Sequence, residues 1–388
     1  MAASKLYQVL TNKWVVMMSA AGTAGGVFLL YRSSSSSGGG ARYRLTTSLE
    51  GKTFVITGAN SGIGRHAAQS LARKKARVIM ACRDMNKCRV ERRDIVLATG
   101  NKQVVCRQLD LASCDSVQKF AERMLREENV DVLLNNAGVM NGKERKITRD
   151  GFEEHLGVNY LGHFLLTLLL VDKMVFRETP ARIINVTGLS HPAETIDWSD
   201  FNREQCYSQN AKGEDWGSAN LCKMLFTLLL AAKLQGTKVT CNAVYPGACR
   251  TGLHRNMNHE RSLISRYFHR VAHYLLLRTP AQGANQLLYV ATAPELENVS
   301  GTLFSNCAEA EINSQAKQQA TQLRLWATSE KWTRLRERKE EIDRRLSQEN
   351  SPDWYKQLLE EQKKDQEGWM PWLKSFVYGS SGAVSGTS

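Results

Sequence analysis

The stretch TGANSGIG, Thr57 to Gly64, decides the fold of this chain. It follows the short apolar run FVIT (54–57) and opens a stretch with helical character over 62–75. Its three glycines permit a tight turn, a close approach of the backbone to a phosphate, and close packing of a helix on a strand. The first turn of such a helix presents N–H groups and the positive end of the helix dipole to an anion. The stretch therefore predicts a strand–turn–helix unit that binds a dinucleotide phosphate.

Apolar strand-like runs alternate with helical patterns from Thr53 to about Trp332. The runs are short, rich in β-branched residues and mostly continuous, as expected for strands that are buried on both faces. After FVIT they are VIMA (78–81), VVCRQL (104–109), VLLN (132–135), RIINVT (182–187) and VTCNAVY (239–245). The helical stretches between them include 62–75, 113–128, 152–176 and 217–235. This alternation predicts a single α/β domain over 51–333, built on a Rossmann-type, doubly wound parallel sheet.

The composition limits the remaining possibilities. Of 388 residues, 42% are hydrophobic and 23% are charged, which excludes a largely disordered chain and a protein with many membrane spans. The formal net charge of +14 favours anionic partners, whether nucleic acid, a lipid surface or an anionic cofactor. The basic cluster 73–93 lacks the aromatic residues on which bases stack, so we expect no nucleic-acid partner. A solvated helix face beside a phosphate site, or acidic lipid headgroups, explains that cluster better.

The nine cysteines are scattered, and no two of them have C-x-x-C spacing. This pattern predicts mostly reduced, buried thiols in a domain that faces the cytosol, rather than a framework of disulfides. Cysteines and histidines with ligand spacing are also missing, so we expect no metal site.

The first 50 residues differ in composition from the rest. The run 14–31 has about 18 uncharged residues, close to the minimum for a membrane span. A cleaved signal peptide is the alternative, because Ser19, Ala20 and Ala21 are small, but apolar residues resume after them. We therefore expect an uncleaved anchor over 1–32 and a flexible linker over 33–50. The arginines that follow the run place the domain in the cytosol by the positive-inside rule.

The last 55 residues break the alternation of strands and helices. The region 334–388 begins with charged residues at helical spacing and ends in an aromatic segment, which predicts a helical C-terminal extension. Its aromatic residues have three places to dock: the chain's own domain, a membrane surface or a partner protein. We expect docking on the domain for this set, which comprises Trp354, Trp369, Trp372, Phe376 and Tyr378. We also expect helix 152–176 to be buried rather than a second membrane span, because Asn159, His163 and Asp172 interrupt its apolar run.

Further motifs follow TGANSGIG in a characteristic order. They are DL (110–111), NNAG (135–138), GFEEHLGVNYLGHFLLT (151–167), RIINVT (182–187) and YPGACRTGL (245–253). Together the chain resembles the short-chain dehydrogenase/reductase family over about 50–330, and most of all its membrane-anchored, retinol dehydrogenase-like branch. The resemblance implies a nicotinamide cofactor bound by Gly58, Asn60, Ser61, Gly62, Ile63, Gly64, Asp110, Leu111, Asn136, Ala137, Gly138, Lys223, Pro246, Gly247 and Thr251.

The end of the second predicted strand bears on the choice of cofactor. It reads Ala81-Cys82-Arg83, without an acidic residue at its tip to bind a ribose 2′-hydroxyl. An arginine there suits a 2′-phosphate, so Arg83 predicts NADP(H), with Arg65 as a second cation. The resemblance implies the same preference. The alternative is that Arg83 is only a solvated loop cation.

The family's catalytic residues are only half present. Its chemistry uses a tyrosine as general acid/base, a lysine four residues later, a serine and an asparagine. Lys223 and Asn159 match the lysine and the asparagine, but Ala219 stands at the tyrosine position and Gly188 at the serine position. Losing a positioned acid/base costs about 10²–10⁴ in rate. The residues that would substitute for the missing pair are Thr187, Ser190, His191, Tyr207 and Ser218.

A shifted alignment is the other explanation, because the segment 208–217 looks about six residues longer than the family's loop. No Tyr-x-x-x-Lys occurs between residues 190 and 240, which argues against such a shift. The sequence therefore predicts a membrane-anchored, NADP(H)-binding protein with impaired catalysis that senses cofactor or serves as a scaffold. The alternative is an active NADP(H)-dependent oxidoreductase of a lipophilic carbonyl or alcohol, such as a retinoid or sterol. The resemblance favours the endoplasmic reticulum, and the outer mitochondrial membrane or a lipid droplet is compatible with the anchor.

Overall fold

The computed structural model describes residues 43–127, 129–140, 145–177, 179–188, 195–205, 214–251, 277–348 and 351–364. The predicted anchor, most of the predicted linker and the end of the C-terminal extension lie outside these residues.

The described chain is organised around one sheet of eight strands in the order β3-β2-β1-β4-β5-β6-β7-β8. Every neighbouring pair is parallel except β7 and β8. The strands are β1 (Thr53–Thr57), β2 (Arg77–Cys82), β3 (Val104–Gln108), β4 (Val132–Asn135), β5 (Ala181–Val186), β6 (Val239–Tyr245), β7 (Leu303–Ser305) and β8 (Ala308–Ala310). The six predicted strands and the parallel sheet are confirmed. The sequence did not reveal β7 and β8, because strands of three residues leave too short a pattern.

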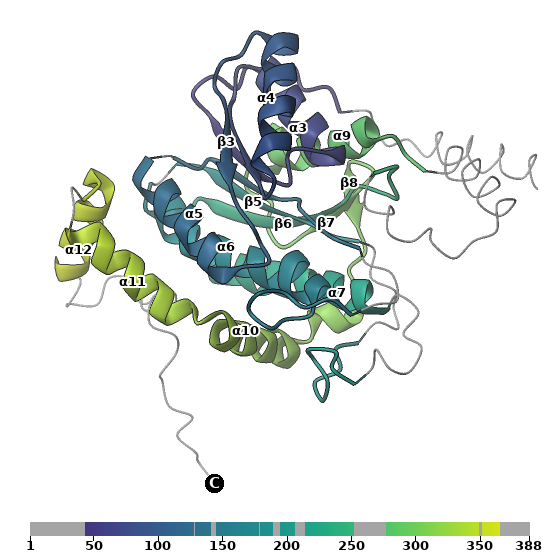
Figure 1. Ribbon diagram of the computed structural model, residues 1–388, viewed down its shortest axis with the longest axis vertical. Coiled ribbons are helices and arrows are strands. Elements are labelled where there is room, and N and C mark those ends of the chain that lie inside the picture. The colour runs from purple at the N-terminus through teal and green to yellow at the C-terminus, as the bar shows by residue number, and fades with distance from the viewer. Residues whose placement is uncertain are drawn as a thin grey trace, which may run out of the picture. The chain divides into compact units, whose positions relative to one another are not determined.

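Helices cover both faces of this sheet, as Figure 1 shows. On one face lie α3 (Gly62–Arg73), α4 (Met85–Thr99) and α9 (Pro280–Thr292). On the other lie α5 (Cys114–Glu127), α6 (Gly162–Phe176) and α7 (Glu214–Lys233). Two separate hydrophobic cores result, one on each face. The strand order reverses between β1 and β4, and in such sheets ligands bind outside the carboxyl ends of the strands at that point.

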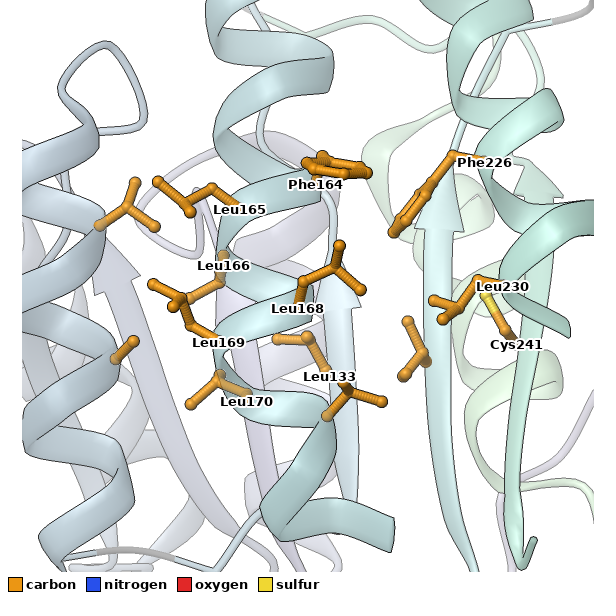
Figure 2. Close-up of a cluster of buried hydrophobic side chains, with 14 of the residues drawn as sticks. Leu133, Phe164, Leu165, Leu166, Leu168, Leu169, Leu170, Phe226, Leu230 and Cys241 are labelled. Carbon is orange, nitrogen blue, oxygen red and sulfur yellow. The ribbon is translucent and has the colours of Figure 1, made fainter. Parts of the chain in front are cut away.

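The apolar stretch 152–176 forms a π-helical segment, His155–Leu161, that continues into α6. Among the described residues, this is the one helix long and apolar enough to cross a membrane, and 94% of its most apolar window is buried within the domain. Figure 2 shows Phe164 and Leu168 directed toward Phe226 of α7 and Leu133 of β4, while Leu165 and Leu169 point to the other side of the helix. The prediction of a buried core helix is confirmed.

Three further helices cover the α5–α6–α7 side of the sheet: α10 (Gln319–Thr333), which packs mainly on α7, and α11 (Leu335–Gln348) and α12 (Asp353–Lys364), which pack on α5 and α6. Their buried apolar side chains join the core on this face and are Leu325, Trp326, Leu335, Ile342, Leu346, Tyr355 and Leu358. The indole of Trp354 donates a 3.0 Å hydrogen bond to Leu125 O and packs against Phe176. Docking on the domain is thereby confirmed for Trp354, while Trp369, Trp372, Phe376 and Tyr378 lie outside the described residues.

Ion pairs also connect α11 to the domain. Arg338 reaches Asp115 at 2.8 Å, Lys339 reaches Asp172 at 2.8 Å, and Arg345 reaches Glu122 at 3.2 Å. The Arg345 side chain is 47% exposed, so its pair contributes at most about 1 kcal/mol. The Lys339 side chain is only 9% exposed, and its pairing with Asp172 mainly offsets the cost of burying the two charges. The buried leucines therefore hold α11 in place, and the ion pairs set its register.

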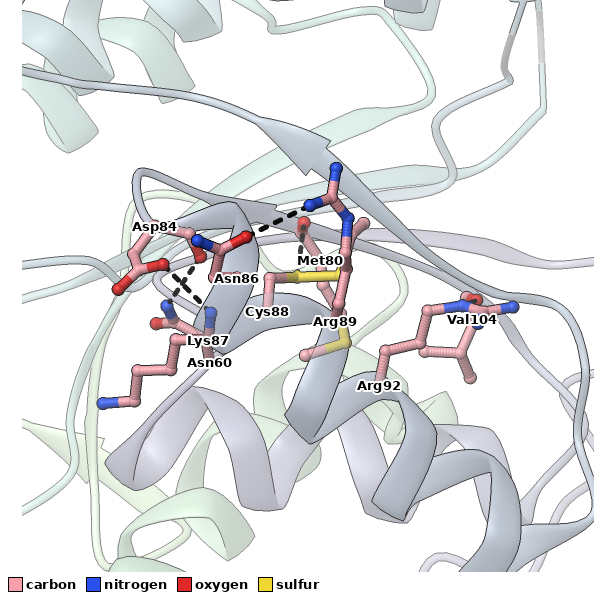
Figure 3. The surroundings of a disulfide bond; sticks show 10 residues. Asn60, Met80, Asp84, Asn86, Lys87, Cys88, Arg89, Arg92 and Val104 are labelled. Carbon is pink, nitrogen blue, oxygen red and sulfur yellow. Dashed lines mark hydrogen bonds between the residues drawn. A yellow bond between two sulfur atoms is a disulfide. The ribbon is translucent and has the colours of Figure 1, made fainter.

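A disulfide joins Cys88, at the start of α4, to Cys106 of the edge strand β3 (Figure 3). The expectation of reduced thiols is wrong for this pair, although Cys82, Cys114, Cys222, Cys241, Cys249 and Cys307 are free. The two cysteines are 18 residues apart, a spacing that carries no signal. They meet because α4 runs back alongside β3, which only the three-dimensional fold reveals.

Candidate active site

The turn between β1 and α3 forms a cradle for an anion. Gly58 and Gly62 have φ angles of +67° and +51°, in the left-handed region that favours glycine. A Cβ atom on Gly64 would lie 2.6 Å from Asn136 Nδ2 and 2.8 Å from Gly58 O, too close for any side chain. Ser61, the N-cap residue of α3, makes no side-chain capping bond, so the first N–H groups of the helix stay available to a ligand. This geometry fits a pyrophosphate.

The hydroxyl of Thr57 connects this turn to the NNAG segment. Its oxygen accepts hydrogen bonds from the backbone N–H groups of Asn136 and Ala137, both at 2.9 Å. The Asn136 amide returns a 2.8 Å bond to Thr57 O. The Thr57 hydroxyl lies 2.9 Å from His163 Nε2, to which it donates. One buried side chain therefore fixes both loops that flank the switch point.

His163 is neutral in this arrangement. Burial, with a further contribution from the Lys223 cation, lowers the pKa of His163 from 6.5 to about 3. With Nε2 accepting from Thr57, the ring carries its proton on Nδ1, which lies 3.1 Å from Asn159 O. The chain of bonds from Asn159 through His163 to Thr57 thus assigns the tautomer.

We predict that Thr57→Val destabilises the fold by about 3 kcal/mol and weakens cofactor binding, because it leaves two N–H groups and His163 Nε2 without their partner. Valine keeps the shape of threonine but lacks the hydroxyl. Urea unfolding and NADPH titration measure the two effects. Thr57→Ser retains the hydroxyl and is the control, so equal losses in both variants would contradict the role assigned to this group.

The side chain of Asn159 supports the loop that follows NNAG. Its Oδ1 accepts from Val139 N at 2.8 Å, and its Nδ2 donates to Val139 O at 3.0 Å. Gly138 lies directly against it, since a Cβ atom there would be 3.4 Å from Asn159 Oδ1. Both polar atoms of the Asn159 amide are therefore engaged in holding backbone.

Lys223 extends from α7 to the end of β5, where its Nζ donates a 2.8 Å bond to Val186 O. Burial lowers the pKa of Lys223 from 10.5 to about 8. One helical turn before it, the methyl group of Ala219 is buried. Gly188 is also buried, two residues beyond β5. Neither Ala219 nor Gly188 has a side chain that can donate a proton.

Two of the five substitute residues lie within the described chain, and both are engaged elsewhere. The Thr187 hydroxyl lies 3.3 Å from the backbone oxygens of Gly188 and Asn220. The Ser218 hydroxyl accepts a 2.8 Å bond from Arg203. Ser218 and Ala219 border a small hollow whose other lining residues are Glu153, Leu156, Ile196, Asp197, Phe201 and Arg203. Ser190, His191 and Tyr207 lie outside the described residues.

Residues 245–251, the described part of the YPGACRTGL segment, contact the glycine turn through Thr251. A Cβ atom on Gly62 would lie 3.1 Å from the Thr251 methyl group, so these two predicted residues are in contact. Gly247 has a φ angle of +83° and lies against the side chain of Arg278. Pro246 contributes its backbone oxygen, which accepts from Arg278 at 3.4 Å. The structure therefore brings together motifs that are almost 190 residues apart.

The predicted adenine side of the site contains Arg83 and Asp110, which follow neighbouring strands. Arg83 is exposed directly after β2, and Asp84 caps α4 by accepting from Lys87 N at 2.9 Å. The Asn60 amide lies 3.5 Å from Asp84 O. Asp110 Oδ1 accepts from Ala112 N, and Leu111 is buried. Arg65, expected as a second cation for the cofactor, pairs with Glu91 of α4.

The sequence interpretation missed the parts played by Thr57 and His163. Thr57 appeared only as the first letter of the glycine motif, and His163 only as an interruption of an apolar helix. Both are polar residues at positions that the apolar pattern of a strand or helix predicts to be buried. A buried polar side chain needs a hydrogen-bond partner, and this could have indicated their roles.

Comparison with known proteins supports one family. A family model described as short chain dehydrogenase matches residues 52–199. Retinol dehydrogenase 13 of Mus musculus is 43% identical over 284 residues, covering 73% of this chain and 84% of that protein. Retinol dehydrogenase 11 of Homo sapiens is 40% identical over 287 residues, covering 73% and 86%.

Solved structures agree. An uncharacterised protein from Mycobacterium paratuberculosis is 30% identical with a TM-score of 0.57, covering 74% of this chain and 95% of that one. The 3-ketoacyl-(acyl-carrier-protein) reductase of Brucella melitensis, crystallised with NADH, has the same fold at 21% identity and a TM-score of 0.51, covering 66% and 97%. With this fold, these motifs and relatives above 40% identity, the chain belongs to the short-chain dehydrogenase/reductase family, in its retinol dehydrogenase-like branch.

Proposed function

We propose that this protein is a membrane-anchored NADP(H)-binding member of its family whose catalysis is impaired and which acts as a cofactor sensor or scaffold. One observation carries the proposal: the cradle for the cofactor is intact, while the two positions that should hold the proton donor and the carbonyl-orienting hydroxyl are Ala219 and Gly188.

Three features support cofactor binding. Position 64 must be glycine because Asn136 Nδ2 and Gly58 O leave no room for a Cβ atom there. An ordinary turn would not require this close packing of the NNAG segment on the glycine turn. The first turn of α3 faces the carboxyl ends of β1 and β4, where the strand order reverses. Thr251 lies against Gly62, which completes the enclosure. A nicotinamide cofactor would supply a hydride, and these residues would bind and orient it.

Impaired catalysis is expected because the described residues around Lys223 offer no side chain placed to donate a proton to a substrate. In active members of the family the lysine acts on a tyrosine one helical turn away, and Ala219 has no proton to give. Lys223 itself bonds to Val186 O, and the Thr187 hydroxyl faces backbone oxygens. Proton transfer to a carbonyl oxygen would then depend on water, at a cost of about 10²–10⁴ in rate.

NADP(H) is the preferred cofactor in this proposal, on the basis of Arg83. We predict that Arg83→Glu raises the Kd for NADPH about 10–100-fold, because a charge-assisted bond to the 2′-phosphate is lost and a repulsion is added. Binding of NADH, which lacks that phosphate, should change little. Fluorescence titration with both cofactors measures the difference. Lys102→Glu is the matched control, because Lys102 is an exposed cation at the opposite end of the sheet, before β3. Equal weakening for both cofactors would contradict the assignment.

The second candidate function is an active NADP(H)-dependent oxidoreductase of a lipophilic carbonyl or alcohol. It is favoured by the names of the relatives, which are retinol dehydrogenases, and by the presence of Lys223, whose pKa burial lowers to about 8. Reduction of retinal by the purified full chain, lost in Lys223→Ala, would establish it. NADPH binding without such turnover would support the impaired protein.

The uncharged run 14–31 and the arginines after it support an anchor with the domain on the cytosolic side. The endoplasmic reticulum is the proposed location. Flotation of the full chain with vesicles, compared with a chain that begins at residue 33, tests the anchor.

A further inference from the structure

The outer face of α4 exposes large apolar side chains. Among the residues that the structure describes, four large hydrophobic side chains are exposed: Val90, Leu97, Ile147 and Leu323. Two of them belong to α4, with relative exposures of 54% for Val90 and 78% for Leu97. Isolated apolar residues on a surface need no explanation. Two exposed apolar side chains on one short helix form a surface feature if they lie on the same face of that helix.

Val90 and Leu97 lie on the same line of the helix, because residues seven apart are almost in register over two turns. The inner face of α4 is already occupied by Cys88 and Ile95, which are fully buried. The helix therefore has apolar residues on two opposite faces, one packed on the domain and one directed away from it. Domain packing cannot account for the outer one.

Basic residues flank this outer apolar line. Arg93 lies between Val90 and Leu97 on the same face, its side chain is 73% exposed, and it forms a 3.7 Å ion pair with the partly exposed Asp94 beside it. An exposed pair of this kind is weak, so Arg93 can exchange Asp94 for a lipid phosphate. Arg89 is exposed one turn before Arg93 and bonds only locally, with Asn86 at 3.2 Å. Two apolar residues beside two arginines are the pattern of a helix that lies in the plane of an anionic lipid surface.

The first described residues pack on the same face of the sheet as α4. Tyr43, the first described residue, exchanges two bonds with Asn285 of α9, and its hydroxyl lies 3.0 Å from Thr292. Helix α9 packs on α3 and α3 packs on α4, so the chain enters on the same face of the sheet as α4 (Figure 1). Eleven residues lie between Tyr43 and Tyr31, the end of the apolar run, and the chain between these two tyrosines spans at most about 40 Å.

We propose that the outer face of α4 rests on the anionic surface of the membrane, with Val90 and Leu97 inserted at the headgroup boundary and Arg89 and Arg93 contacting lipid phosphates. This inference rests on the anchor in the proposed function and adds a second, separate point of membrane contact. It assigns the surplus cations of α4 to lipid rather than to cofactor. A domain that contacts the membrane both through the anchor and through α4 would have a fixed orientation relative to the bilayer.

The test uses the full chain with an environment-sensitive fluorescent amino acid at position 97, bound to vesicles. One set contains phosphatidylcholine with phosphatidylserine, and the other contains phosphatidylcholine alone. A nitroxide on the acyl chains quenches fluorophores that reach the boundary. The matched control carries the fluorophore at Leu323, which is 50% exposed on α10, on the other side of the sheet. Flotation of the same samples reports the anchor independently.

We expect quenching at position 97 in the anionic vesicles to be at least about twofold stronger than at position 323, because an interfacial helix buries its apolar side about 5–10 Å into the boundary. The pair Arg89→Glu with Arg93→Glu should remove this difference while leaving flotation intact. A chain that floats but shows equal quenching at both positions would overturn the inference alone. A signal at position 97 that depends on protein concentration, not on lipid, would also overturn it in favour of a second copy. A chain that does not float would overturn the anchor as well.

Discussion

The double substitution Gly188→Ser with Ala219→Tyr should raise NADPH-dependent reduction of retinal by about 10²–10⁴-fold over the natural chain. Tyrosine at position 219 returns a phenol one helical turn from Lys223, whose nearby cation lowers the pKa of a phenol. Serine at position 188 returns a hydroxyl beyond β5, where it can orient the substrate carbonyl. Turnover is measured by the loss of NADPH absorbance with purified full chain.

The control for this gain is Gly188→Ser with Ala219→Phe, which adds the same bulk without the hydroxyl. Ala219 is buried beside the hollow bordered by Glu153 and Arg203, so both aromatic variants must displace the same neighbours. Equal melting temperatures would show that the two variants are equally stable, so that a difference in turnover reports the hydroxyl group alone. Activity in the phenylalanine variant, or none in a folded tyrosine variant that binds NADPH, would contradict the account of the missing proton donor.

Acid should destabilise the fold through His163. In the folded chain burial lowers the pKa of His163 to about 3, whereas its ordinary value is 6.5. Between these two values the unfolded chain binds a proton that the folded chain does not, so stability is present above pH 6.5 and is lost as pH falls toward 3. From pH 7.5 to pH 5 the free energy of unfolding should fall by about 2 kcal/mol from this group alone. Urea unfolding at the two pH values measures the loss.

His163→Gln removes the titrating ring and keeps an acceptor for Thr57, so it should lower stability at pH 7.5 but flatten the decline toward pH 5. Lys223 adds little in this window, because it is mostly protonated in both states below its folded pKa of about 8. His66→Gln is the matched control: burial and the neighbouring Arg65 also lower the pKa of His66, but this ring is only half-buried, so its removal should flatten the decline less than His163→Gln. An unchanged pH dependence in His163→Gln would show that acidic groups, not the histidine, cause the loss.

The sequence predicted the fold where its pattern was long and repetitive. Six strands were found because each is a short, mostly continuous apolar run, and helix 152–176 was predicted to be buried from the polar residues within it. The strands β7 and β8 were missed for lack of length. The Cys88–Cys106 disulfide was missed because nothing in linear spacing records that α4 lies alongside β3.

The motifs of the site could be predicted from the sequence, but the contacts that hold them together could not. The motifs predicted that Gly62 and Thr251 both bind the cofactor, but only the fold shows that these two residues are in contact. The roles of Thr57 and His163 depend on partners from three separate segments, which no local pattern specifies. Arg65 illustrates the reverse case: its position suggested a phosphate ligand, and the fold pairs it with Glu91.

The helices α11 and α12 have a consequence for the order of events during synthesis. Leu346, Tyr355 and Leu358 complete a core whose other members begin with Val55, so the first and last parts of the domain depend on each other. Until translation passes residue 358, the apolar side of α5 and α6 is left without its cover. Nascent chains that stall or end early would expose this surface to aggregation. A nonsense codon before Leu346 would therefore act like a defect in the middle of the core.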